Sequence, residues 1–145
     1  MKPVITWILI ADAKSARIIE FKGPGTGLRQ ITGKLCDAPE ESRFADREGR
    51  TFSSFSNIRH KLETNVRDTR DLEQHVDEML GKLSRFLLRG EFDRLIVCAP
   101  PQTLGVIRKR IPADLKRELL AELPKDLTHV QTEGLAPHFE NILAV

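Results

Sequence analysis

The chain has 145 residues, of which 40% are hydrophobic, 30% are charged and 6% are aromatic. This length suits one domain of ordinary size, and the apolar fraction is too high for a wholly disordered chain. The 23 Lys and Arg residues exceed the 21 Asp and Glu residues by a net charge of only +2, which does not by itself indicate a nucleic-acid partner.

Neither the apolar runs nor the cysteines point to export or to a membrane. No stretch of about 18 apolar residues occurs, so we expect no membrane-spanning helix. The cysteines, Cys36 and Cys98, are too few for a disulfide framework, which favours a reducing compartment. The apolar run Val4–Ala11 suits a buried strand better than a signal peptide. We therefore expect a single cytoplasmic domain over residues 1–145.

The first part of the chain predicts three strands in a meander. Val4–Ala11 is β-branched and almost continuously apolar, which is typical of a central strand covered on both faces. A turn leads to a second strand, Ala16–Phe21, expected to be antiparallel to the first. Gly23–Gly27 predicts another turn, since no helix follows it as a phosphate loop requires. Leu28–Leu35 is interpreted as a third strand nearer an edge.

Residues 36–67 show no sustained periodicity and predict a long flexible arm. The arm mixes acidic with basic residues and is interrupted by phenylalanines. Arg side chains suit phosphate and aromatic rings stack on unpaired bases, so the arm is a candidate RNA contact. The arm residues singled out as candidate binding residues are Arg43, Arg47, Arg50, Arg59 and His60.

A continuous apolar stripe from Leu72 to Leu87 predicts the longest helix. Its expected start is Asp68 or Thr69, and Gly90 is expected to end it. Arg94–Ala99 then predicts a second buried strand.

Four more elements are expected towards the C-terminus. Thr103 is expected to cap a short helix over Leu104–Arg110, and a second helix is expected from Pro112 through Leu123. Asp126–Gln131 is interpreted as the last strand, and Thr132 as the start of a terminal helix. The whole order predicts an α/β fold, a mixed β-sheet with helices packed on it.

Five positive charges lie within ten positions around the end of the short helix. They are candidates for contacts with RNA phosphates, and an ordinary solvated helix face is the alternative. These candidate binding residues are Arg108, Lys109, Arg110, Lys116 and Arg117.

Catalytic and metal sites are not indicated by the sequence. The four histidines share no short ligand spacing with each other or with a cysteine. Asp12 lies just beyond the first strand, where two-metal nucleases need a carboxylate, but Asp93 and Asp126 are expected at strand beginnings. We therefore expect no metal and no other cofactor. Asp12 is interpreted as a turn cap and kept as a candidate binding residue.

Several sequence blocks resemble the bacterial family named "protein required for attachment to host cells". They run in the family's order and include Trp7–Asp12, Ala16–Ile18, Asp46–Arg50, Arg59-His60, Phe92–Pro101, Leu104–Arg108 and Lys125–Thr128. The resemblance implies a fold similar to the middle domain of archaeal and eukaryotic class-1 translation release factors, which is ribonuclease H-like. It also suggests a ribosome-associated role. The Gly-Gly-Gln loop of release factors is absent from the sequence, so peptide release is not carried over.

The leading hypothesis is a non-enzymatic binding protein with RNA or the ribosome as its partner. One alternative is an attachment factor acting at or through the cell envelope. Another is a hydrolase of RNA or nucleotides that uses Asp12 together with arm residues. Homo-oligomerisation is left open, since an edge strand can pair with a second copy.

Overall fold

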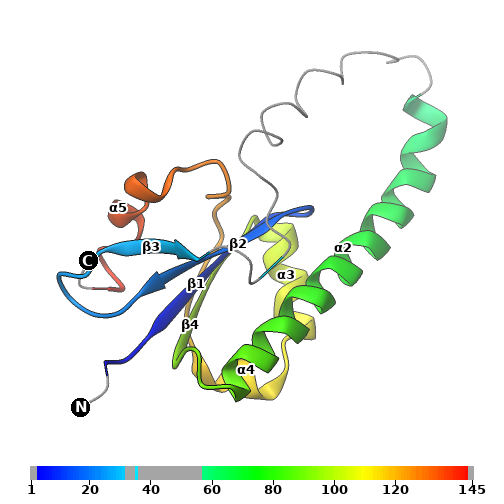
Figure 1. Cartoon of the computed structure of the whole chain (residues 1–145). Helices are drawn as coiled ribbons and strands as arrows, with labels where there is room; N and C mark the ends of the chain where they lie inside the picture. Colours follow the sequence, from blue (N-terminus) through cyan, green and yellow to red (C-terminus); the bar gives the residue numbers. More distant parts are fainter. Residues whose placement is uncertain (1–2, 32–34, 36–56, 144–145) are drawn as a thin grey trace.

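A mixed five-stranded β-sheet with helices on both faces forms the core (Figure 1). The computed structural model describes residues 3–31, 35 and 57–143, and for residues 57–68 it describes the backbone alone. The elements are β1 (Thr6–Ala11), β2 (Ala16–Phe21), β3 (Leu28–Ile31), α2 (Asn57–Leu88), β4 (Arg94–Cys98), α3 (Pro101–Arg110), α4 (Ala113–Glu118), β5 (Leu119–Leu123), η1 (Thr132–Gly134) and α5 (Ala136–Phe139).

The strand order is β3-β2-β1-β4-β5. β1 pairs antiparallel with β2 and parallel with β4, and β5 extends the parallel part beyond β4. β1 is therefore central, and all six of its residues are buried. This arrangement explains its continuous apolar run and confirms the expected mixed α/β sheet.

Alternate side chains of the strands enter two separate cores, as the pleat requires. On one face Trp7 and Leu9 of β1 pack with Val76 and Leu83 of α2 and Leu104 of α3. The Trp7 ring also stacks on Phe92 at a centroid distance of 4.6 Å.

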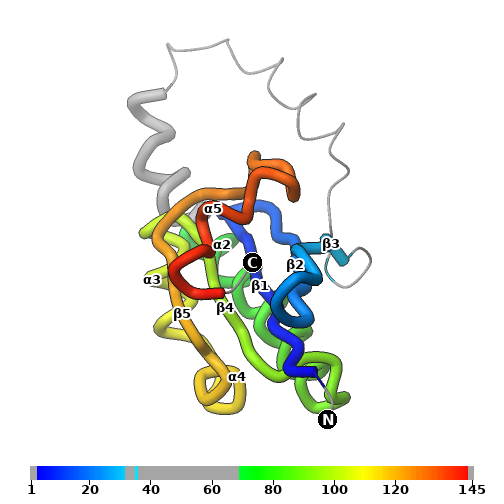
Figure 2. Tube along the Cα trace, turned by 90° about the vertical axis from the view of Figure 1, so that its left-hand side faces the viewer, coloured from blue at the N-terminus to red at the C-terminus, as the bar shows by residue number. Residues whose placement is uncertain are grey.

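The opposite face of the sheet is covered by the C-terminal segment. Ile8, Ile10 and Ile96 pack there with Leu135 and Phe139. Figure 2 looks from the side of α5, with α2 behind the sheet. The fold therefore has three layers.

The N-terminal boundary of α2 differs from the sequence expectation. Residues 57–67 belong to this helix and not to an arm, while the expected arm residues before Asn57 lie outside the described residues. Charged residues dominate the first turns of α2, so the sequence shows no apolar stripe there, although Arg, Lys, Leu and Glu favour helix. Gly90, with φ +75°, follows the end of the helix as expected. Within the described ranges, no helix is both long and apolar enough to cross a membrane.

Three predictions for the C-terminal third are wrong. The short helix expected over Leu104–Arg110 with Thr103 as its cap begins at Pro101, and Pro100 occupies the cap position. The expected helix from Pro112 through Leu123 is a six-residue helix, α4, followed by strand β5. The leucines of this stretch fit a helical spacing, but Leu119–Leu123 pairs with β4, and this tertiary pairing overrides the local preference. Asp126–Gln131 forms no strand. Asp126 therefore follows the last strand instead of beginning it.

Candidate functional site

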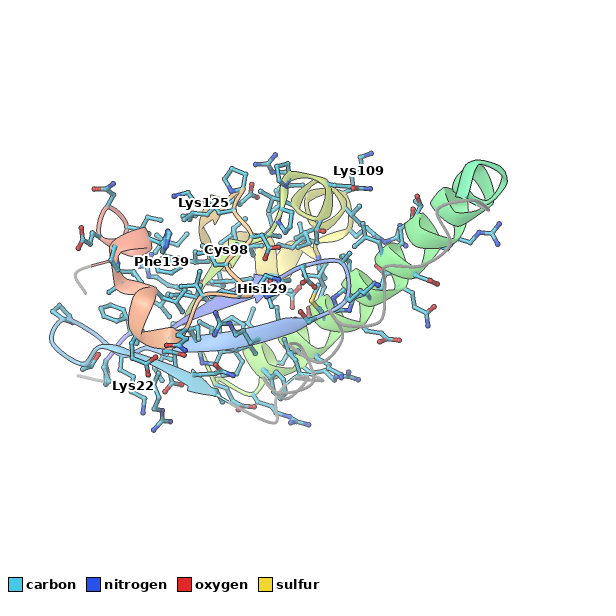
Figure 3. The ribbon with its side chains drawn as sticks, turned by 90° about the horizontal axis from the view of Figure 1, so that it is seen from above. Lys22, Cys98, Lys109, Lys125, His129 and Phe139 are labelled. Atoms are coloured by element: carbon cyan, nitrogen blue, oxygen red, sulfur yellow. The ribbon has the colours of Figure 1, made fainter. Side chains whose placement is uncertain are left out.

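Three potential metal ligands meet at the carboxyl ends of the parallel strands, the edge where open α/β sheets bind ligands. Asp12 follows β1, and Asp126 and His129 lie on the segment after β5 (His129 is labelled in Figure 3). Each offers one ligand atom, and these atoms lie within 4.8 Å of one another. We call Asp12, Asp126 and His129 the carboxyl-edge cluster.

Asp12 has two distinct carboxylate oxygens. Its Oδ1 accepts hydrogen bonds from the backbone N–H of Lys14 (2.9 Å) and from both the N–H (2.6 Å) and the hydroxyl (2.9 Å) of Ser15. The predicted turn cap is thereby confirmed. Its Oδ2 lies 3.3 Å from the Thr128 hydroxyl. Burial opposes ionisation, but the hydrogen bonds outweigh it and lower the pKa of Asp12 below 3.8, so this side chain is an anion at neutral pH.

The Asp126 carboxylate faces the same hydroxyl. Its Oδ1 accepts the Thr128 N–H at 3.0 Å and lies against Thr128 Oγ1. A hydroxyl has one hydrogen, so it can donate to Asp12 or to Asp126 but not to both at once. No salt bridge to either carboxylate is found among the described residues. The two carboxylates therefore give the carboxyl-edge cluster a negative electrostatic potential, which attracts cations.

Arg17 positions the segment that carries Asp126 and His129. This β2 side chain is only 2% exposed, and its Nη2 donates to the backbone carbonyls of Leu127 (2.8 Å) and Val130. Reasoning from the sequence missed Arg17. The available signal was a basic residue, Arg17, between apolar neighbours in a strand expected to be largely buried, which a buried polar partner explains.

The donor set of two carboxylates and one imidazole suits Zn²⁺ or Mn²⁺, whereas Mg²⁺ prefers oxygen ligands alone. Three protein ligands leave coordination positions for water or a phosphate oxygen. The sequence argument against such a site placed Asp126 at the beginning of a strand, and the structure corrects that placement. Asp93 does lie at the amino end of β4, where its carboxylate accepts the N–H of Ile5 at 2.9 Å.

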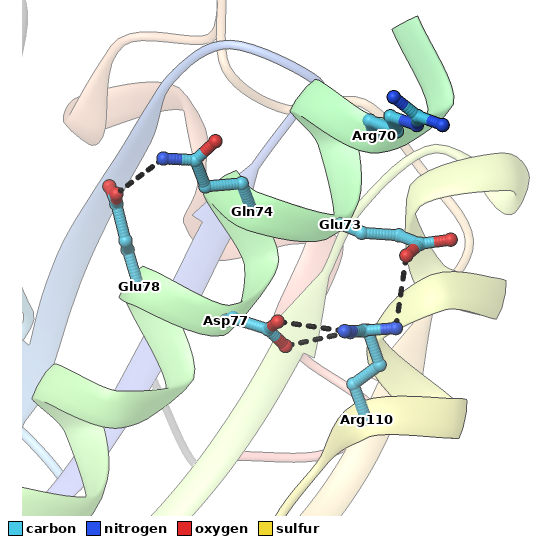
Figure 4. Close-up of a pocket in the computed structure, with 6 residues that line it drawn as sticks. All are labelled: Arg70, Glu73, Gln74, Asp77, Glu78 and Arg110. Atoms are coloured by element: carbon cyan, nitrogen blue, oxygen red, sulfur yellow. Dashed lines mark hydrogen bonds and ion pairs between the residues drawn. The ribbon is translucent and has the colours of Figure 1, made fainter. Parts of the chain in front are cut away.

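Two of the five candidate basic residues are held in ion pairs. Arg108 Nε lies 2.5 Å from Glu122 Oε2 of β5. Arg110 donates two hydrogen bonds to Asp77 of α2, at 2.7 and 2.8 Å, and a third to Glu73 at 3.2 Å (Figure 4). The bond from Arg110 lowers the pKa of Asp77. These two arginines join α3 to its neighbours.

The other three, Lys109, Lys116 and Arg117, are exposed on α3 and α4. No ion pair of these three is found in the part of the chain that the structure describes. We call them the basic surface; Lys109 is labelled in Figure 3.

The five candidate arm residues have no described side chain, so their distances to the carboxyl-edge cluster and to the basic surface are not defined. Arg43, Arg47 and Arg50 lie outside the described residues. Arg59 and His60 belong to α2, but their side chains lie outside the description as well. The predicted role of the arm in binding stays a prediction.

The fold and the carboxyl-edge cluster together define the class: a three-layer α/β protein with polar side chains at the carboxyl ends of its parallel strands. The family model described as "Protein required for attachment to host cells" matches residues 7–139, and the chain belongs to this family. The family expected from the sequence blocks is thereby confirmed. The match includes both the carboxyl-edge cluster and the basic surface. No curated protein matches the chain.

Proposed function

We propose that this member of the host-attachment family is a non-enzymatic RNA-binding protein that associates with ribosomal particles. The observation that carries the proposal is the basic surface, where Lys109, Lys116 and Arg117 are exposed on consecutive helices. These side chains can approach phosphate without breaking an ion pair to a described residue. Arg108 and Arg110 would first have to leave Glu122 and Asp77.

The proposal includes a cytoplasmic location, so that any effect on attachment is indirect. It also includes a ribonuclease H-like fold similar to the release-factor middle domain. The central β1, antiparallel to β2 and parallel to β4, supports this part of the proposal.

Salt dependence of RNA binding tests the basic surface. Each phosphate contact contributes about 0.7 to the slope of log K against log salt for a single strand. Replacing Lys109, Lys116 and Arg117 by Ala should therefore lower the slope for a ribosomal RNA fragment by about 2. The matched control replaces Lys22, Arg29 and Arg85, which removes the same charge elsewhere. Equal slopes in the two variants would rule out the proposed surface.

Sedimentation of the tagged protein in cell lysate tests the ribosomal partner. We expect co-migration with ribosomal particles that ribonuclease treatment abolishes. Protein that stays at the top of the gradient at low salt would contradict the ribosomal association.

A second candidate function is metal-assisted hydrolysis of a phosphate ester, which the carboxyl-edge cluster favours. A divalent cation at Asp12, Asp126 and His129 would polarise a phosphate and lower the pKa of a bound water. Calorimetric titration with Mn²⁺ tests it, followed by turnover of RNA or nucleotides with Mn²⁺ present. Asp126→Asn and His129→Ala should abolish Mn²⁺ binding and turnover, while the basic-surface variant keeps Mn²⁺ binding. Absence of Mn²⁺ binding to the wild-type chain would remove this candidate.

A further inference from the structure

An apolar groove lies at the amino ends of the parallel strands, at the end of the sheet opposite the carboxyl-edge cluster. Segments that are far apart in the sequence line it together, and we call it the amino-end groove. Its volume of about 480 Å³ lies in the range of small-molecule sites. Its lining includes Val4 before β1, Phe21 and Lys22 at the end of β2, Arg94 of β4, Leu120 of β5 and Leu143 after α5.

The second core reaches the surface at this groove. Phe21 and Leu143 belong to the core that Phe139 of α5 completes. The helix α5 has only four residues. Figure 2 shows α5 over the upper part of the sheet, whereas β1 begins at the lower end. The short covering layer therefore leaves apolar side chains accessible at the amino ends of the strands.

Exposed apolar side chains gather at the same place. The large hydrophobic side chains that are exposed among the described residues are Val4, Leu88 and Leu120. Two of these three, Val4 at 50% exposure and Leu120 at 40%, line the amino-end groove. Single exposed apolar side chains are ordinary, but a group of them around an opening into the core marks a binding surface. The groove is therefore suited to an apolar group.

The charged part of the lining is basic. Lys22 (labelled in Figure 3) and Arg94 line the groove, and no acidic side chain is among the described residues that do so. The Lys22 ammonium lies 3.5 Å from Glu20, while no ion pair of the Arg94 guanidinium is found with any described residue. The neighbouring Asp93 accepts the N–H of Ile5 at 2.9 Å. An apolar groove with two cations is complementary to an apolar chain that ends in a carboxylate.

We propose that the amino-end groove binds an alkyl carboxylate of the kind represented by a medium-chain fatty acid. The alkyl chain packs on Val4, Phe21 and Leu120. The carboxylate lies at the Arg94 guanidinium, and Lys22 adds positive charge beside it. The inference goes beyond the proposed RNA contact, because the groove shares no residue with the basic surface or with the carboxyl-edge cluster.

Titration followed by amide NMR tests the ligand class on the full chain. Octanoate, kept below the concentration at which it forms micelles, should shift the amide signals of Val4, Phe21 and Leu120. Because each buried CH₂ group adds to the affinity, decanoate should bind about tenfold more tightly and hexanoate about tenfold more weakly. Octylamine carries the opposite charge and should bind far more weakly than octanoate. No shift at these amides with octanoate, or equal affinity for octylamine, overturns the proposal.

Two variants test the individual contacts, each with a matched control. Leu120→Asp places a carboxylate in the groove and should abolish octanoate binding, whereas Leu88→Asp, at an exposed position outside the groove, should leave it unchanged. Arg94→Gln should weaken octanoate binding about tenfold but leave the affinity for octanol unchanged, a split that loss of stability cannot produce. Arg85→Gln should change neither affinity. Octanoate binding that survives Arg94→Gln undiminished overturns the proposal, and this test stands if Leu120→Asp unfolds.

The other occupant to test is a second copy of this chain. Sedimentation equilibrium with and without octanoate separates the two occupants. A monomer, or a dimer that octanoate dissociates, supports the alkyl carboxylate. A dimer that Leu120→Asp abolishes and octanoate leaves intact would assign the amino-end groove to self-association and overturn the proposal.

Discussion

Replacing Arg17 by Met should destabilise the protein far more than a surface arginine would. The change removes the donors that hold the carbonyls of Leu127 and Val130, while the methylene stem stays in place. Hydrogen bonds to charged groups contribute about 1.5–3 kcal/mol each, and relief from burying a charge offsets part of the loss. We expect a net loss of about 3 kcal/mol, a large part of the 5–15 kcal/mol that stabilises a typical protein.

Urea unfolding followed by fluorescence measures this loss, because Trp7 is the single tryptophan and is buried against Phe92. Arg29→Met on the neighbouring strand is the control. Arg29 is 74% exposed and lies 3.7 Å from Glu20, so its loss should stay below about 1 kcal/mol. Equal losses in the two variants would refute the positioning role of Arg17, as would unchanged amide exchange in the segment from Leu127 to Val130.

Three other predictions concern acid stability, thiol chemistry and the core. The hydrogen bonds that lower the pKa of Asp12 stabilise the folded protein above pH 3.8, and this stabilisation is lost as the pH falls through the lowered pKa. In thermal melts, the melting temperature of Asp12→Asn should therefore fall less steeply with acid than that of the wild type. An equally steep fall in both proteins would contradict this prediction. Burial raises the pKa of the Cys98 thiol to about 12, although the charge of Lys125 opposes the rise. In a Cys36→Ser variant, whose one remaining thiol is Cys98, a thiol reagent should therefore react only after urea has unfolded the chain. Rapid labelling of the folded variant would be the contrary result. Leu83→Ala removes a fully buried side chain and should lower the free energy of unfolding by about 2–5 kcal/mol. Leu88 of the same helix is 82% exposed, so Leu88→Ala should change it by less than about 0.5 kcal/mol. Similar losses in the two variants would be inconsistent with the described core.

Patterns that depend on local burial could be predicted from the sequence. The run Val4–Ala11 indicated a central strand because both of its faces are buried, and β1 occupies that place. The stripe from Leu72 to Leu87 indicated the packed part of α2 for the same reason. The helix predicted over Leu119–Leu123 was wrong because the leucines there suit a helix and a strand equally. Only the pairing of this segment with β4 decides between the two.

The site was predictable only in part, because most of its partners are distant in sequence. Asp12 was found from its position after a strand. Asp126 and His129 were missed through the wrong strand assignment, and Arg17 because its carbonyl partners lie 110 and 113 residues away. The ion pair of Arg110 with Asp77 spans 33 residues, so no local pattern could show that part of the basic charge is neutralised.

The central position of β1 has a consequence for the order in which the chain is made. β1 and β2 are adjacent in sequence and can form a hairpin early, but the other edge of β1 pairs with β4, which begins only at Arg94. At 5–20 residues per second, the roughly 80 residues between them take about 4–16 seconds to synthesise. During that interval a largely apolar strand has one unpaired edge, which is a template for aggregation. We therefore expect chains that end before β4 to aggregate more readily than the full chain.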